Sequence, residues 1–191
     1  MFLTKKQIKN IGFKSVGENV LISDKATFYR PERISIGNNV RIDDFCVLAN
    51  NITIHNNVHI ALYACLLSGS NSVIEMEDFA GVAFRSLILT NSDDYSGLAM
   101  TNPTIPDKYR KVIEKSIKIG RHCVIGTGST ILPGANIADG TSVGAMSLVM
   151  KPTKPWKVYF GIPARPIAER EKKILELEQE YLKELNEVNN A

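Results

Sequence analysis

Aliphatic residues recur every six positions along most of the chain. In most of these hexads a second small or apolar residue follows four positions later, so that Val40 follows Ile36 and Ala64 follows Ile60. The frame slips after Ser70 and is absent between residues 92 and 116. The periodic positions are Ile36, Ile42, Leu48, Ile54, Ile60 and Leu66, then Met76, Val82 and Ile88, and finally Ile119, Ile125, Ile131, Ile137, Val143 and Val149. One structural repeat therefore underlies most of the chain.

A period of six matches neither an α-helix, which repeats about every 3.6 residues, nor a single strand, which alternates about every two. It fits a coil of three short strands that closes after about 18 residues and points one aliphatic side chain per strand inward. Gly and Asn gather between the hexads, as in IGNN and IHNN, where corners need residues that tolerate positive φ. A β-sandwich would instead give alternating strands at irregular spacings of about 8–12 residues. The pattern predicts a mainly β fold, a parallel β-helix over residues 16–166.

Short helices are expected at both ends of this β-helix. Residues 1–15 read as a helical cap, because Thr4 can cap a helix over residues 4–11 that Gly12 can end. Residues 167–191 read as a C-terminal helix, because apolar residues form one stripe on a charged background. That stripe contains Ile167, Ile174, Leu177, Tyr181, Leu185 and Val188. We expect the helix to pack on the prism wall or on a neighbouring subunit.

The non-periodic segment, residues 92–116, is too long for an ordinary connection. Loops above about 12–15 residues in a compact domain are usually functional or disordered. This one carries apolar residues that can be buried, namely Tyr95, Leu98, Met100, Ile105, Tyr109 and Val112. We therefore expect an ordered insertion, and its burial against an adjacent subunit would build a binding pocket.

Composition narrows the function classes. The chain has 191 residues, enough for one domain, and a net charge of +3, too mild to indicate nucleic acid, for which no motif is present. No apolar run reaches the roughly 18 residues of a transmembrane helix, and the N-terminus lacks a signal-peptide pattern. Three cysteines without a CxxC pair are typical of free thiols in a reducing compartment. These features favour a cytoplasmic protein that does not span a membrane.

The IGxxV hexads, together with the runs NNVRIDDFCVL, SDDYSG, TNPTIP and PWKVYFGIPARPI, resemble the hexapeptide-repeat acyltransferases. The resemblance covers nearly the whole chain and is strongest to the sugar O- and N-acetyltransferases of bacterial surface-polysaccharide biosynthesis, such as lipopolysaccharide. It implies a left-handed parallel β-helix, a homotrimer with active sites between subunits, and acetyl-CoA as co-substrate. A non-catalytic β-helix scaffold is the alternative.

The chain departs from this family where a catalytic base is expected. Related enzymes commonly carry His after Thr-Asn at the start of the insertion, whereas this chain has Ser92 after Thr90-Asn91. The remaining local bases are the adjacent carboxylates Asp93 and Asp94, and burial would raise a carboxylate pKa towards a useful value. Among the three histidines, His59 is the catalytic candidate because its hexad position points outward. Ser92, Tyr95 and Arg110 are candidates for binding the acceptor. The alternative for Asp93 and Asp94 is an Asp-Asp turn that only opens a solvated loop.

A missing strong base favours an amine acceptor. A neutral amine attacks a thioester without a base, whereas a sugar hydroxyl needs its proton removed. We therefore predict acetyl transfer to the amino group of a nucleotide-linked amino-deoxy sugar. O-acetylation of a polysaccharide hydroxyl is the alternative, since an aspartate can also serve a hydroxyl.

The resemblance also indicates where the thioester would bind. The coils after the insertion would hold the pantetheine arm against the backbone, and the tail would meet the nucleotide. The cofactor candidates are Gly126, Thr127, Ala145, Lys151, Lys154, Trp156 and Arg165. Solubilising surface is the alternative for the basic residues, and packing on the prism is the alternative for Trp156. We predict no metal, because His55 and His59 point differently and His122 lies several coils away.

Overall fold

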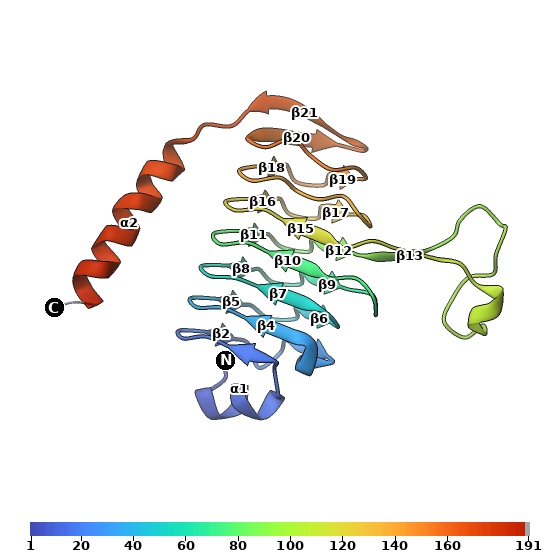
Figure 1. Cartoon of the computed structure of the whole chain (residues 1–191), viewed down its shortest axis with the longest axis horizontal. Helices are drawn as coiled ribbons and strands as arrows, with labels where there is room; N and C mark the ends of the chain where they lie inside the picture. The colour runs from blue at the N-terminus through green and yellow to red at the C-terminus, as the bar shows by residue number, and fades with distance from the viewer. Residues whose placement is uncertain (190–191) are drawn as a thin grey trace.

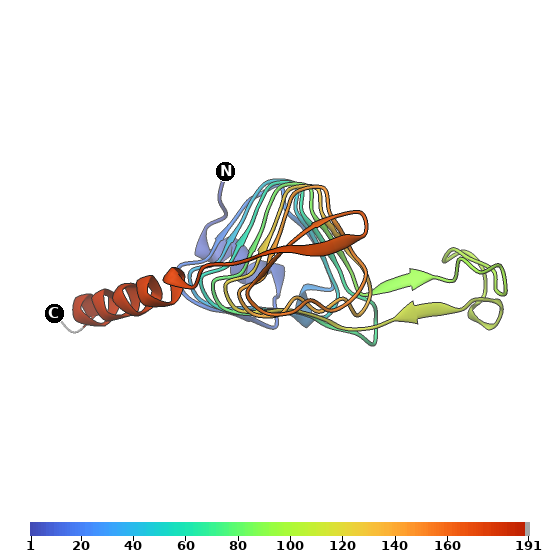
Figure 2. The ribbon, with the colours of Figure 1, turned by 90° about the horizontal axis from the view of Figure 1, so that it is seen from above.

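The chain winds into a triangular prism whose three walls are β-sheets (Figure 1, Figure 2). The computed structural model describes residues 1–189; residues 190–191 and the side chains of Asn186, Val188 and Asn189, all within the predicted helical segment, lie outside the described part. Sheet 1 contains β1 (Ser15–Val16), β4 (Ile34–Ile36), β7 (Ile52–Ile54), β10 (Ile74–Met76) and β15 (Ile117–Ile119). Sheet 2 contains β2 (Leu21–Ile22), β5 (Arg41–Ile42), β8 (His59–Ile60), β11 (Gly81–Val82), β16 (Val124–Ile125), β18 (Ser142–Val143), β20 (Lys157–Gly161) and β21 (Ala164–Glu169). Sheet 3 contains β3 (Thr27–Tyr29), β6 (Val47–Ala49), β9 (Cys65–Leu67), β12 (Leu87–Leu89), β17 (Thr130–Ile131) and β19 (Leu148–Val149).

The aliphatic hexad positions fill the prism, as predicted. In sheet 2, Ile42, Ile60, Val82 and Ile125 lie in register on successive parallel strands, and all four side chains are buried. The second hexad positions are buried as well, from Val40 to Cys123. Burying each large aliphatic side chain contributes about 1.5–3 kcal/mol. Stacking of like on like is therefore the main source of the solenoid's stability.

Asparagine serves the corner between sheets 1 and 2, which we call the 1–2 corner. Asn19, Asn39 and Asn57 have φ of 54°, 54° and 57°, a left-handed conformation that Asn tolerates better than most residues. Their side chains form a ladder, in which Asn19 Nδ2 donates to Asn39 Oδ1 at 2.8 Å and Asn39 Nδ2 donates to Asn57 Oδ1 at 3.1 Å. The corners thus also stabilise the stacking of coils. The other two edges are called the 2–3 corner and the 3–1 corner.

The N-terminal helix forms where the sequence predicts it. Helix α1 (Lys5–Ile11) has Thr4 as its N-cap, with a capping box to Gln7, and ends at Gly12 with φ 83°. Its one buried side chain, Ile8, joins the prism core. The helix therefore covers the first coil, a role that the end of a solenoid requires.

The C-terminal helix begins later than predicted. Residues 164–169 form β21, which pairs antiparallel with β20, and the helix α2 runs from Lys173 to Asn189. The expected start at residue 167 is wrong because residues up to Glu169 pair with the edge of β20, which offers hydrogen-bond partners. Ile167 therefore belongs to a strand and not to the helical stripe. None of the described helices is long and apolar enough to cross a membrane.

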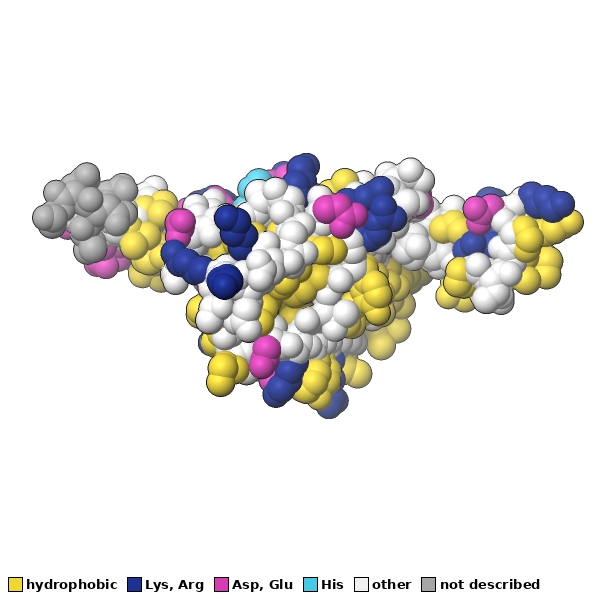
Figure 3. Space-filling model, turned by 90° about the horizontal axis from the view of Figure 1, so that it is seen from below, with side chains coloured by type: hydrophobic (Ala, Val, Ile, Leu, Met, Phe, Trp, Pro, Cys, Tyr) yellow, Lys and Arg dark blue, Asp and Glu magenta, His cyan; other side chains and the backbone are white. Residues whose placement is uncertain are grey.

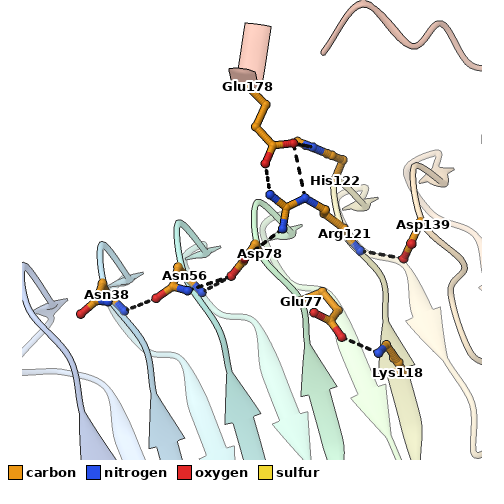
Figure 4. A network of polar contacts seen from close by, with 9 residues as sticks. All are labelled: Asn38, Asn56, Glu77, Asp78, Lys118, Arg121, His122, Asp139 and Glu178. Carbon is orange, nitrogen blue, oxygen red and sulfur yellow. Dashed lines mark hydrogen bonds and ion pairs between the residues drawn. The ribbon is translucent and has the colours of Figure 1, made fainter. Parts of the chain in front are cut away.

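Helix α2 contacts the 1–2 corner mainly through polar side chains (Figure 4). The Glu178 carboxylate pairs with the Arg121 guanidinium and lies 2.7 Å from His122 Nε2. The Tyr181 ring meets the edge of Phe79 at 6.2 Å between centroids. The expected packing of the apolar stripe on a prism wall is not met within one chain, because the helix touches the corner and Leu177 and Tyr181 remain exposed.

The insertion leaves the prism at the 3–1 corner as a projecting arm. Strands β13 (Asn91–Asp93) and β14 (Val112–Glu114) pair antiparallel and form its stalk, and its tip contains the 3-10 helix η2 (Asp107–Tyr109); a second 3-10 helix, η1, covers Pro31–Arg33. The arm extends away from all three walls (Figure 1, Figure 2). The expected burial of its apolar residues is not met within one chain, since Tyr95 is 91% and Leu98 85% exposed. Hydrophobic side chains are visible around the arm tip in Figure 3.

Candidate active site

The two predicted carboxylates lie at the end of the arm stalk that is farther from the prism. Asp93 is the last residue of β13, and its Oδ2 accepts a hydrogen bond from the Asn102 N–H at 3.1 Å. Asp94 is 8% exposed, and its Oδ1 accepts from the Ser96 N–H at 3.0 Å. The other oxygen, Asp94 Oδ2, is buried and has no hydrogen-bond partner among the described residues. Lys111 Nζ approaches it to 3.9 Å. The Ser96 N–H thus holds one oxygen of the Asp94 carboxylate in place, and the other oxygen remains free to accept a hydrogen bond.

The expectation of a raised carboxylate pKa is wrong for Asp94. The Ser96 backbone N–H stabilises the ionised form, the Lys111 charge adds to this, and together they lower the pKa of Asp94. Asp94 is therefore anionic at neutral pH. It can attract an ammonium group and hydrogen-bond to an amine, but it is a weak base for a hydroxyl.

Of the three predicted acceptor-binding residues, only Arg110 joins the carboxylates. Its Nη2 lies 3.6 Å from Asp93 Oδ1, and its Nη1 donates to Asp107 Oδ1 at 3.1 Å. Its Nε is buried without a hydrogen-bond partner in the described part of the chain. Ser92 Oγ donates to the Asp93 carbonyl at 3.2 Å, and Tyr95 is exposed without such a contact in the described region. Arg110 therefore holds Asp93 and Asp107 together, while Tyr95 stays free.

The third catalytic candidate, His59, belongs to a different cluster. Its side chain points outward from β8 and is 50% exposed, as predicted, and its Nε2 lies 2.7 Å from Asp43 Oδ2. Arg41 Nε donates to Asp43 Oδ1, also at 2.7 Å. These contacts lie on the outer face of sheet 2, whereas the arm leaves from the 3–1 corner. One chain therefore does not bring His59 together with Asp93 and Asp94.

The predicted pantetheine residues gather at the 2–3 corner. Gly126 and Thr127 follow β16, and Ala145 occupies the same corner one coil later, where the Met146 N–H donates to the Thr127 carbonyl at 2.8 Å. A Cβ on Gly126 would lie 2.6 Å from the Ala145 nitrogen. Glycine is thus required here by the next coil of the prism itself. This corner and the arm lie on different edges of the prism.

The predicted nucleotide-binding residues divide into two groups. Lys151 and Arg165 line a depression of about 390 Å³ at the end of the prism, together with Tyr159. Trp156 lies at the 1–2 corner, where its ring covers Gly140 and its backbone N–H donates to the Asp139 carbonyl. Lys154 lies close by, since its carbonyl accepts from Thr141 Oγ1 at 3.1 Å. Trp156 therefore packs on the prism, the alternative considered above.

The histidines do not converge in the described structure. His122 is held by Glu178, and burial lowers its pKa, as do the charges of Arg121 and Arg170. His55 lies near Glu75 and Glu77, and ligand atoms of these three residues are within 4.8 Å of one another. However, the Lys118 ammonium already pairs with Glu77. A cation at this place would have to displace that ammonium.

A buried polar cluster at the foot of the arm was not anticipated. Ser72 Oγ lies 2.6 Å from Thr90 Oγ1 and donates to Glu114 Oε1 at 2.8 Å. The only trace of this cluster in the sequence is the slip of the hexad frame after Ser70.

Comparisons with known proteins agree with this architecture. The family model "Bacterial transferase hexapeptide (six repeats)" matches residues 33–64. The chain is 44% identical over 183 residues to the dTDP-4-amino-4,6-dideoxy-D-glucose acyltransferase of Escherichia coli, covering 94% of each protein. Its structure matches AntD, an N-acyltransferase from Bacillus cereus in complex with dTDP and 3-hydroxybutyryl-CoA, with a TM-score of 0.95, 47% identity and coverage of 97% and 98%. A variant of AntD in complex with dTDP-4-amino-4,6-dideoxyglucose and coenzyme A matches with a TM-score of 0.92, 47% identity and coverage of 96% and 98%.

Proposed function

The chain belongs to the hexapeptide-repeat sugar acyltransferases, with their left-handed parallel β-helix, and from this premise we propose that it N-acetylates a dTDP-linked 4-amino-4,6-dideoxy sugar. The co-substrate is acetyl-CoA, and the product is an amide-bearing precursor of a bacterial surface polysaccharide such as lipopolysaccharide O-antigen or capsule. A nucleotide sugar and acetyl-CoA are both cytoplasmic metabolites, so we place the reaction in the cytoplasm.

The observation that carries the proposal is the free oxygen of Asp94. A buried carboxylate oxygen without a hydrogen-bond partner in the described chain is costly unless a ligand supplies one. An amine supplies that partner, because a protonated amino group binds the anion and a neutral amino group donates N–H to it. The lowered pKa of Asp94 suits this role better than removal of a proton from a hydroxyl.

The proposed chemistry then needs few groups. The neutral amine attacks the thioester carbonyl, a C–N bond forms, and a tetrahedral intermediate carries the negative charge on oxygen. This intermediate collapses with cleavage of the C–S bond, and the sulfur leaves with the bonding electron pair. The excess proton on nitrogen passes to Asp94 or to solvent and finally protonates the thiolate. Asp94 orients the amine and receives its proton late, while Asp93 and Arg110 hold the end of the stalk.

The positions of the candidate residues support a homotrimer as the active form. In one chain the arm that carries the carboxylates leaves from the 3–1 corner, whereas Gly126, Thr127 and Ala145 lie at the 2–3 corner. A second copy that presents its 2–3 corner to the arm would complete the site and cover the exposed Tyr95 and Leu98. Sedimentation or light scattering of the purified chain tests this, and a monomeric active enzyme would contradict it.

Matched acceptors test the reaction class. Thiol release from acetyl-CoA is measured with the dTDP-linked 4-amino-4,6-dideoxyglucose and with the same nucleotide sugar carrying a hydroxyl at that carbon. We expect turnover with the amine and only background release with the alcohol. Equal or faster turnover with the alcohol would favour the O-acetyltransferase alternative, and no release and no CoA binding would favour a scaffold.

A further inference from the structure

The coil below the arm has an enlarged corner. At the 3–1 corner, the connection between β6 and β7 consists of residues 50–51, whereas the connection between β9 and β10 consists of residues 68–73. This enlargement causes the slip of the hexad frame after Ser70. We call residues 68–73 the socket loop. It lies directly beneath the point where the arm leaves the prism, because β9 pairs with β12, the strand that precedes the arm.

The socket loop holds both strands of the arm through one chain of hydrogen bonds. The Gly69 N–H donates to Thr90 Oγ1 at 2.7 Å, and the Thr90 hydroxyl lies 2.6 Å from Ser72 Oγ. Ser72 Oγ donates to Glu114 Oε1 at 2.8 Å, and the Asn71 N–H donates to the same oxygen at 2.7 Å. Thr90 directly precedes β13 and Glu114 ends β14. One loop therefore fixes both strands of the stalk at the end where they meet the prism.

The Glu114 carboxylate determines which groups donate and which accept in this series of hydrogen bonds. Burial acts to raise the pKa of Glu114, but the hydrogen bonds from Asn71 and Ser72 outweigh it and lower that pKa, so the carboxylate is ionised and only accepts. Ser72 must then donate to Glu114 and accept from Thr90, which in turn accepts from Gly69. Each hydroxyl donates once and accepts once. The cluster is fully satisfied, and such buried networks rigidify the elements that they join.

The socket loop itself is also fixed. Asn51 Nδ2 lies within 3.1 Å of the Gly69, Ser70 and Ser72 carbonyl oxygens, and Ser68 Oγ donates to the Ser72 carbonyl at 2.7 Å. Gly69 lacks a side chain at the closest contact, where a Cβ would lie 2.1 Å from Glu114 Oε1. The loop is thus shaped around the Glu114 carboxylate.

We infer that the socket loop is a positioning element for the reaction: through Ser72, Thr90 and Glu114 it sets the direction of the arm and so the position of Asp93 and Asp94. This inference rests on the proposed function for its catalytic consequence. Asn91 pairs with Glu114 at the foot of the arm, and Asp93 pairs with Val112 two residues farther out. A shift at the foot therefore moves the two short strands and the carboxylates with them. A displacement of about 1 Å at a reacting group can cost on the order of 100-fold in rate.

The test compares Ser72→Ala with Ser23→Ala. Ser23 is also buried and also hydrogen-bonds to a carboxylate, that of Asp44, but it lies in the first coil, away from the arm. Hydrogen–deuterium exchange is measured over residues 91–114. We expect exchange about fivefold to tenfold faster in Ser72→Ala, as for one lost hydrogen bond, and unchanged exchange in Ser23→Ala. Unchanged exchange of the arm in Ser72→Ala would overturn the inference.

Kinetics of the same variants test the catalytic consequence. We expect kcat to fall about tenfold or more in Ser72→Ala and Glu114→Ala, with KM for acetyl-CoA unchanged. Glu114→Gln should restore most of the activity, because its amide oxygen can accept from both Asn71 and Ser72. Faster exchange of the arm with an unchanged kcat would refute positioning. If the wild-type chain does not turn over the amino sugar, the proposed function fails, while the exchange data still decide whether the socket loop holds the arm.

Discussion

Replacing Asp94 with asparagine separates the chemistry of the carboxylate from its structural role. Asn keeps an Oδ1 that accepts the Ser96 N–H, a hydrogen bond of 3.0 Å. It replaces the free Oδ2, which lies 3.9 Å from Lys111 Nζ in the wild-type chain, with an NH₂ group that faces the same ammonium. The variant therefore retains the turn but loses the anion and the acceptor that would bind an amine.

The expected loss follows from these contacts. A positioned acid or base contributes about 10²–10⁴-fold to a rate, or about 3–5 kcal/mol of barrier. The lowered pKa of Asp94 makes it a weak base, and an amine needs little help. We therefore expect the lower end, a fall in kcat of about 100-fold. Leaving the new NH₂ group without an acceptor costs about 1–3 kcal/mol of stability.

The assay is thiol release at saturating acetyl-CoA with the dTDP-amino sugar, and Asp24→Asn, in the first coil, is the matched control. The KM for acetyl-CoA should be unchanged. A group with a lowered pKa keeps its charge until the pH falls below the ordinary carboxylate range. The wild-type rate should therefore rise with pH as the substrate amine deprotonates and show no loss from Asp94 near neutrality. A kcat of Asp94→Asn within about threefold of wild type would refute the role derived from its free oxygen.

Two further substitutions test the fold, and a third tests the thioester corner. Ile125→Ala removes a fully buried member of the sheet 2 stack and should lower the free energy of unfolding by about 2–5 kcal/mol; a loss below about 1 kcal/mol in urea denaturation would contradict the packing described. Glu178→Ala removes the carboxylate that joins α2 to Arg121 and His122 and should increase proteolysis of α2 while the prism unfolds at nearly the same temperature; equal protease resistance would show that other contacts hold the helix. Gly126→Val pushes a side chain into the next coil and should weaken CoA binding at least about tenfold by calorimetry, as one misfit of about 1.4 kcal/mol; unchanged affinity would place the thioester elsewhere.

The sequence predicted the prism more completely than it predicted the site. Ile60 and Leu66 are identified by spacing alone, because a solenoid repeats one environment and each coil contacts mainly its neighbours. The ends of the insertion are equally visible, because the period stops there. The direction of the arm is not, since it depends on contacts of Glu114 with a loop more than forty residues earlier.

Single electrostatic contacts explain the other differences. The pKa of Asp94 is lowered and not raised because of hydrogen bonds from Ser96, first of all its backbone N–H, and the charge of Lys111, which no spacing rule reveals. The docking of α2 depends on Glu178 meeting Arg121 and His122, 57 and 56 residues earlier in the chain. The ring of Trp156, a candidate for stacking on adenine, covers Gly140 instead. Site chemistry is set by such individual contacts, and the spacing of residues in one sequence does not reveal them.

The chemical nature of the product tests the central proposal most directly. The purified chain is incubated with acetyl-CoA and dTDP-4-amino-4,6-dideoxyglucose, and the product is examined by NMR and by its stability in mild base. We predict one new acetyl group on the amino nitrogen, an amide that survives base, with one thiol released per product. A base-labile ester, or no acetylated sugar despite bound CoA, would contradict N-acylation of this sugar.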